Sequence, residues 1–128
     1  MKIAATVARF LLGLVFLVFG SNMLLHFLPN PPLPPGPMAD FSIAMAKSHY
    51  GVMVGFFQVV PAILLLINRY VPLALTILAA EIVNILTFHI TMQPQGLPMA
   101  VVVAILWVLV FLRVKPSFAG IFEATAQR

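Results

Sequence analysis

The sequence predicts an all-α membrane protein, a four-transmembrane-helix bundle with a short interfacial helix in the first outer loop. Of its 128 residues, 62% are hydrophobic and only 8% are charged, which is too little charge to cover a soluble domain of this size. Four apolar runs approach the ~20 residues that a helix needs to cross a bilayer. Because these runs and their connections use nearly the whole chain, we expect a single membrane domain over residues 1–128.

The first span is expected over about residues 3–27. Lys2 before an apolar run is typical of a secretory signal, but this run is longer than the ~7–15 residues of a signal core. The segment Pro29–Pro37 follows, with six prolines in nine residues. Proline fixes φ and disfavours the helical region for the residue before it, so we expect an extended connector across the outer end of the bundle.

The remaining elements follow from the length of each apolar run. A short helix over about 38–48 is too short to cross a bilayer and is expected at the interface. Three further spans are expected over about 50–67, 71–91 and 97–114. Pro72 stands in the first turn of the third span, where a helix tolerates proline. The C-terminal tail carries Phe118 and Phe122, which we expect on the membrane surface.

The distribution of cations predicts the orientation. With the N-terminus inside, the outer segments hold only Lys47. The cytoplasmic segments hold all the other cations, which are Lys2, Arg9, Arg69, Arg113, Lys115 and Arg128. An excess of Lys and Arg marks cytoplasmic loops. We therefore expect a multi-pass protein of a bacterial-type inner (cytoplasmic) membrane, with the N and C termini cytoplasmic.

Composition also excludes several functions. The absence of cysteine rules out disulfides, thiolate metal sites and iron–sulfur clusters. The net charge of +4 comes from scattered cations that form no basic stripe, so nucleic acid is not an expected partner. We find no phosphate loop, haem-attachment motif or nucleophile–base pair. We therefore expect no covalently bound cofactor, and a role as an auxiliary subunit rather than as an enzyme.

Glu81 stands near the middle of the third span. A charged side chain at the centre of a span costs ~2.5–3.5 kcal/mol on insertion scales, so Glu81 should face the bundle and be either protonated or paired. Arg9 in the first span is the nearest candidate cation. Two interpretations remain open at this point. The Arg9–Glu81 pair fixes helix register, or Glu81 belongs to a proton, quinone or substrate site.

Two amides stand at similar depth in the outer half of their spans. Asn84 follows Glu81 by three residues, so the two share a helix face, and Gln58 stands in the second span. Amides at this depth commonly form hydrogen bonds between helices. Together with Glu81 and Arg9, Gln58 and Asn84 are the candidate substrate or quinone contacts. The catalytic residues, if there are any, stay unknown.

Small residues mark the helix-packing faces. Gly13 and Gly20 share one stripe of the first span, and Gly51 and Gly55 share one stripe of the second. Glycines on such stripes let a neighbouring backbone approach closely. Helix packing is therefore the role that we predict for these four glycines.

The three histidines, His26, His49 and His89, all fall at the outer ends of spans, where most of the methionines also lie. Histidine and methionine form a ligand set for Cu(I), but no regular ligand spacing appears. We therefore predict no metal site and keep the three histidines only as weak candidates.

Four segments resemble the DoxX-like family of small membrane proteins. They are Ala8–Gly20, Asn68–Ala74 with Val83–His89, and the short Gln95–Pro98. The resemblance covers nearly the whole chain and implies a four-helix membrane bundle associated with quinone-linked redox complexes. Two positions depart from the family pattern: Asn22-Met23 stands where many relatives have lysine, and Gln58 where many have glutamate. If those charges serve the chemistry of the family, this chain has lost it, or Glu81 replaces one of them.

From these observations we expect an accessory subunit of a membrane electron-transfer complex, respiratory or photosynthetic, near quinone. Its expected partners are the lipid bilayer and other membrane-protein subunits. The alternatives are a free-standing quinone-linked redox enzyme, a small transporter that uses Glu81 and Asn84, and a chaperone-like membrane scaffold.

Overall fold

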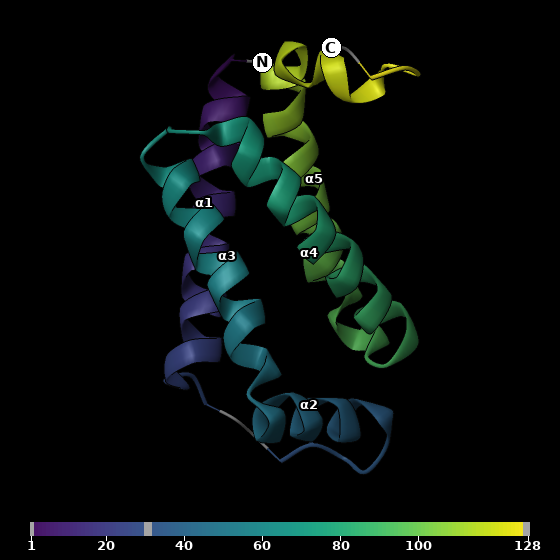
Figure 1. Cartoon of the computed structure of the whole chain (residues 1–128). Coiled ribbons are helices and arrows are strands. Elements are labelled where there is room, and N and C mark those ends of the chain that lie inside the picture. Colours follow the sequence, from purple (N-terminus) through teal and green to yellow (C-terminus); the bar gives the residue numbers. More distant parts are fainter. Residues whose placement is uncertain (1, 30–31, 127–128) are drawn as a thin grey trace.

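The structure is a computed structural model that describes residues 2–29 and 32–126. Within these ranges the chain is helical and contains no strand (Figure 1). The helices are α1 (Lys2–Leu25), α2 (Pro37–Ser48), α3 (Tyr50–Leu66), α4 (Val71–Thr91) and α5 (Leu97–Val114). The short 3₁₀ helices η1 (Pro94–Gly96) and η2 (Lys115–Phe122) precede and follow α5. These bounds differ from the predicted ones by at most two residues at any end of the long helices.

Three of these helical segments are long and apolar enough to cross a membrane: α1, α4 and the continuous segment from η1 through η2. The α3 helix has 17 residues, which corresponds to ~26 Å of helix. It reaches spanning length only when it is counted with α2, and the two helices meet at a bend of 87°. Three to four candidate spans are therefore present, and the short helix before α3 has the predicted position in the sequence.

The four long helices form a ring in which each packs against two neighbours. The α1 helix contacts α3 and α5, and α4 contacts the same two helices. As a result α1 and α4 lie diagonally across the bundle. Figure 1 shows that the α1–α3 pair and the α4–α5 pair diverge toward the end where α2 lies crosswise. The α2 helix packs on α3, and the Phe41 ring lies 5.5 Å from the Phe88 ring of α4.

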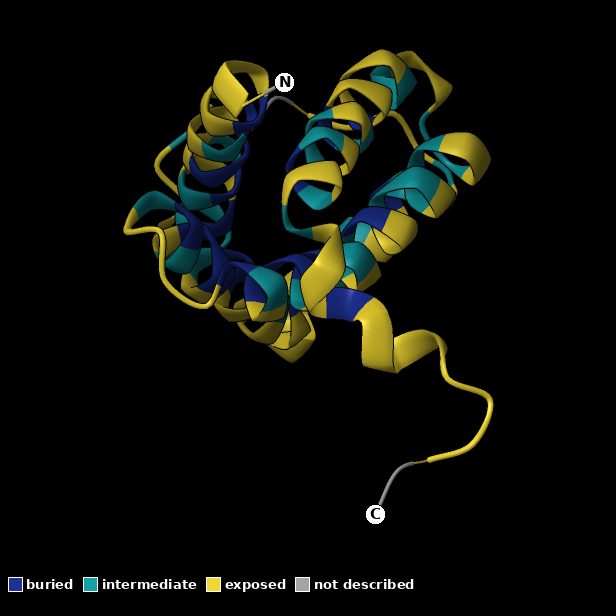
Figure 2. Ribbon diagram, turned by 90° about the horizontal axis from the view of Figure 1, so that it is seen from above, coloured by how far each residue is buried: buried dark blue, intermediate teal, exposed yellow. Residues whose placement is uncertain are grey.

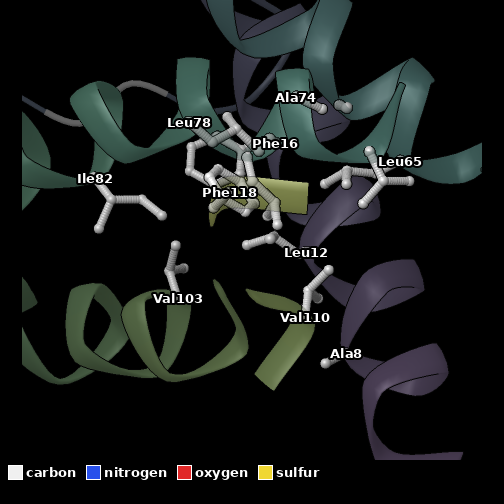
Figure 3. Close-up of a cluster of buried hydrophobic side chains, with 13 residues drawn as sticks. Ala8, Leu12, Phe16, Leu65, Ala74, Leu78, Ile82, Val103, Val110 and Phe118 are labelled. Carbon is white, nitrogen blue, oxygen red and sulfur yellow. The ribbon is translucent and has the colours of Figure 1, made fainter. Parts of the chain in front are cut away.

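The core is apolar and is shared by all four long helices (Figure 3). Leu12 and Phe16 of α1 contribute to it together with Leu65, Leu78 and Val110 of the other three helices. Figure 2 shows exposed residues over much of the outer helix surface, and many of these are large hydrophobic side chains. An apolar exterior of this kind is suited to contact with lipid.

The C-terminal segment differs from the prediction. Phe118 is buried in the core, where its ring lies 5.1 Å from that of Phe111. Phe111 in turn stacks on Trp107 at 5.2 Å. Of the two phenylalanines, Phe122 is the exposed one. The 3₁₀ geometry of η2 continues the helical path after α5 and brings Phe118 back against the bundle, a turn that the apolar pattern does not reveal.

The proline connector forms no helix at Leu33, Pro34 and Pro35, and the chain bends at Pro35 and Gly36 before α2 begins. It lies at the same end of the bundle as α2 (Figure 1). The expected connector also includes Asn30 and Pro31, which lie outside the described residues.

Candidate functional site

The candidate site is a pair of neighbouring polar side chains between α3 and α4. The side-chain amide of Gln58, on α3, lies within reach of the carboxyl group of Glu81, on α4. Gln58 is the one polar side chain of the described residues that is classed as fully buried, with 6% of its surface exposed. Glu81 is half-buried. Counted from the α2 end of the bundle, the two residues lie about eight and ten residues into their helices, which corresponds to ~12–15 Å of helix.

Small residues let α1 and α3 pack closely next to Gln58. A Cβ atom at Gly20 would lie 2.8 Å from the Gln58 Cβ and 3.1 Å from the carbonyl oxygen of Gly55. The absence of a side chain at Gly20 therefore lets α3 approach α1 closely. Because the α1 side of Gln58 is filled by backbone, its amide reaches instead toward α4 and Glu81.

The predicted packing role is confirmed for three of the four glycines. Gly13 lies against Leu66 and the carbonyl oxygen of Ala62, and Gly20 and Gly55 lie against each other. Gly51 is also buried, but a Cβ there would lie 3.6 Å or more from its neighbours, an ordinary contact distance. Close approach of α1 and α3 therefore depends on Gly13, Gly20 and Gly55.

The predicted Arg9–Glu81 pair is wrong. The guanidinium of Arg9 donates a hydrogen bond from Nη1 to the carbonyl oxygen of Leu65, in the last turn of α3. It also lies 4.5 Å from the centre of the Phe10 ring. The physical reason is the order of the helices around the ring, because α1 and α4 lie diagonally and α3 and α5 stand between them.

Arg9 therefore caps a helix rather than pairing with an acid. The last carbonyl groups of an α-helix lack intrahelical donors, and the C-terminus of the helix dipole carries partial negative charge. A cation at this position satisfies both. Arg9 therefore ties α1 to α3 and stands apart from the Gln58–Glu81 pair.

Asn84 does not join the pair either. Its side chain is exposed, and its amide Nδ2 donates to the carbonyl oxygen of Ala80, one turn back on the same helix, at 2.9 Å. The predicted hydrogen bond between helices is therefore wrong for Asn84, whereas the amide of Gln58 lies within reach of Glu81 on the neighbouring helix. Residues three apart share a broad helix face, but only Glu81 of the two is turned toward α3.

The histidines have local structural roles. His26 and His49 are exposed and adopt the left-handed conformation at helix ends, with φ of 52° and 63°. The Nδ1 atom of His89 lies 2.8 Å from the carbonyl oxygen of Ile85. The His89 ring fills the space that a side chain at Gly96 would need. Among the described residues, no group of three or more potential metal ligands of the His, Cys, Asp and Glu types comes together.

A hollow that sequence reasoning missed lies between α4 and α5. It has a volume of about 250 Å³, and its lining includes Ala79, Ile82, Val83 and Trp107. The indole Nε1 of Trp107 donates to the carbonyl oxygen of Leu75 at 2.8 Å, so the indole ring is fixed beside the hollow. Glu81 is absent from this lining, and the hollow is therefore not part of the Gln58–Glu81 site.

Comparison with known proteins found no matching family model, no matching curated protein and no matching solved structure. The class of protein therefore follows from the sequence and the structure of the chain alone. Its described residues form an all-helical multi-pass membrane protein with three to four candidate spans, in which the buried amide of Gln58 lies near the half-buried carboxyl group of Glu81.

Proposed function

We propose that the protein is a four-span subunit of a membrane electron-transfer complex and that Gln58 and Glu81 contact quinone. The observation that carries the proposal is the proximity of the Gln58 amide and the Glu81 carboxyl group, which lie at similar depth in the neighbouring helices α3 and α4. The resemblance to the DoxX-like family, stated above on its motifs, is the second support.

The chemistry of the pair suits a quinone headgroup. A primary amide supplies two N–H donors, and a carboxyl group accepts hydrogen bonds or, when protonated, donates one. A quinone carbonyl needs a donor, and a quinol hydroxyl needs an acceptor. Polar side chains within spans are costly in lipid, and they commonly mark ion, proton or ligand positions. In this proposal Glu81 exchanges hydrogen bonds with the headgroup while Gln58 orients the carboxyl group.

We expect Glu81→Gln to leave the protein folded and to reduce quinone retention and the quinone-linked activity of the parent complex by tenfold or more. The amide keeps the size of the side chain, but it cannot exchange a proton and it replaces one carboxyl oxygen with an NH2 donor. Quinone content is measured by extraction from protein purified in mild detergent, and activity is measured in native membranes. The matched control is Asn84→Ala on the same helix. The amide that this change removes forms its hydrogen bond with the backbone of α4.

Unchanged quinone content and activity in both Glu81→Gln and Gln58→Leu would contradict this proposal. Mild-detergent purification followed by identification of the bound proteins tests the role as a subunit. Stable co-purification with larger redox subunits is expected. Isolation of the chain with bound quinone and its own turnover would instead support a free-standing enzyme.

The four-span topology gives a separate prediction. With the N-terminus in the cytoplasm, reporter fusions after Arg69 and Lys115 should report the cytoplasm, and a fusion after Gln95 should report the outside. If α3 does not cross and only three segments span the membrane, every one of these three readings is reversed. Paired alkaline phosphatase and fluorescent-protein fusions at each site distinguish the two topologies, since each reporter is active on one side only.

A further inference from the structure

A polar pocket lies at the end of the bundle where α1 and α4 begin and α5 ends. It has a volume of about 300 Å³, at the lower end of the range for small-ligand sites. Buried apolar side chains, among them Val71 and Val110, contribute to its lining. Its polar lining residues are Lys2, Thr6, Arg9, Asn68 and Arg113.

The charge of this lining is unbalanced. Three of the seven cations of the chain line the pocket, and none of the lining residues is acidic. Arg9 commits Nη1 to the Leu65 carbonyl, which leaves other N–H donors of its guanidinium free. Within the described part of the chain, the side chains of Lys2, Asn68 and Arg113 make no hydrogen bond or ion pair. Like charges that share a pocket repel each other, and an anion between them removes this cost.

The backbone adds to the positive electrostatic potential of the pocket. Val71, in the lining, is the first residue of α4, and no side chain caps that N-terminus. Lys2 is the first residue of α1, and the first turn of that helix carries no acidic residue. Helix N-termini carry partial positive charge and favour anions. The uncapped N-terminus of α4 and three cations, on segments that are far apart in the sequence, thus meet around one pocket.

We propose that this pocket binds a phosphate group, carried either by an anionic lipid headgroup or by free phosphate. Guanidinium groups and helix N-termini are well matched to phosphate oxygens. Basic pockets between transmembrane helices bind lipid headgroups in this manner. Ile3 and Val7, on the same turns of α1 as the cations, are exposed, and they place apolar surface for acyl chains beside the pocket.

The test uses the full-length protein in detergent micelles with added phosphatidylglycerol or phosphatidylcholine, and it measures the thermal unfolding midpoint and the apparent lipid affinity. Phosphatidylglycerol is expected to raise the midpoint by several degrees more than phosphatidylcholine does. Arg113→Gln and Lys2→Gln are each expected to weaken phosphatidylglycerol binding about fivefold. Both side chains are exposed, so neither change should disturb folding.

The matched control is Arg69→Gln, which removes an exposed cation at the same end of the bundle that does not line the pocket. It is expected to keep the affinity of the wild type. A second arm replaces the lipid with inorganic phosphate at constant ionic strength. If phosphate alone reproduces the stabilisation with the same variant pattern, the source is free phosphate; if only the lipid does, it is the headgroup. Equal losses in Arg69→Gln and Arg113→Gln, or stabilisation by neither anion, would overturn the proposal.

Discussion

Replacing Gly55 with alanine is expected to lower the free energy of unfolding by about 1–3 kcal/mol, the usual range for overpacking. A Cβ at this position would lie 2.9 Å from the carbonyl oxygen of Gly20 and 3.1 Å from the Cβ of Met23. Neither neighbour is the flexible end of a side chain, so α1 and α3 would have to move apart. Because Gln58 is on the same face of α3, its contact with Glu81 should weaken as well.

Unfolding in mixed micelles with increasing denaturing detergent measures the change. The control is Gly51→Ala on the same helix, where a Cβ would lie 3.6 Å or more from its neighbours. Alanine also has the higher helix propensity, so this variant should be neutral or slightly more stable than the wild type. Equal destabilisation by the two substitutions would show that the close approach of Gly55 to α1 is not the cause.

The second prediction concerns Arg9. Replacing it with leucine removes the charged side-chain donor to the Leu65 carbonyl, which keeps its hydrogen bond from the Asn68 backbone N–H at 3.3 Å, and we expect a loss of about 1–2 kcal/mol of stability. The double variant Arg9→Leu with Glu81→Leu should lose the sum of the two single effects, because the residues share no partner and independent sites are additive within ~0.5 kcal/mol.

An ion pair between Arg9 and Glu81 would give the opposite outcome. In that case the double variant would recover much of the loss of each single variant, since a well-packed apolar pair often replaces a buried ion pair at little cost. The same double-mutant cycle therefore separates the two arrangements. The substitution Arg69→Leu, at an exposed site, is the control for loss of charge, and it should change stability by less than ~0.5 kcal/mol.

The positions of the helices were predictable because length and hydropathy determine them. Pro72 marks the start of α4, and the proline-rich connector separates α1 from α2. The end of α1 was placed two residues late. The apolar run continues to Phe27, whereas the left-handed conformation of His26 ends the helix at Leu25. A residue's tendency to adopt this conformation depends on its surroundings, which hydropathy does not describe.

The partners of the polar side chains were only partly predictable. Depth along a span indicated that Gln58 and Asn84 were at matching levels, but the structure places Gln58 beside Glu81 and leaves Asn84 exposed. Depth gives no information on which helices are neighbours, so it also placed Arg9 beside Glu81. The order of the helices around the ring depends on the contact of α1 with α3 through Gly20 and Gly55, and a single amphipathic pattern cannot specify that order.

The Arg9 contact also affects how the chain is made. Arg9 and Leu65 are 56 residues apart, and at a synthesis rate of ~5–20 residues per second the acceptor follows the donor by about 3–11 s. During that interval α1 enters the bilayer with an arginine that has no helix end to cap. Its long side chain then extends to water or headgroups at the interface. Arg9 thereby holds the start of α1 at the membrane surface until α3 is synthesised and its last carbonyl groups replace the water.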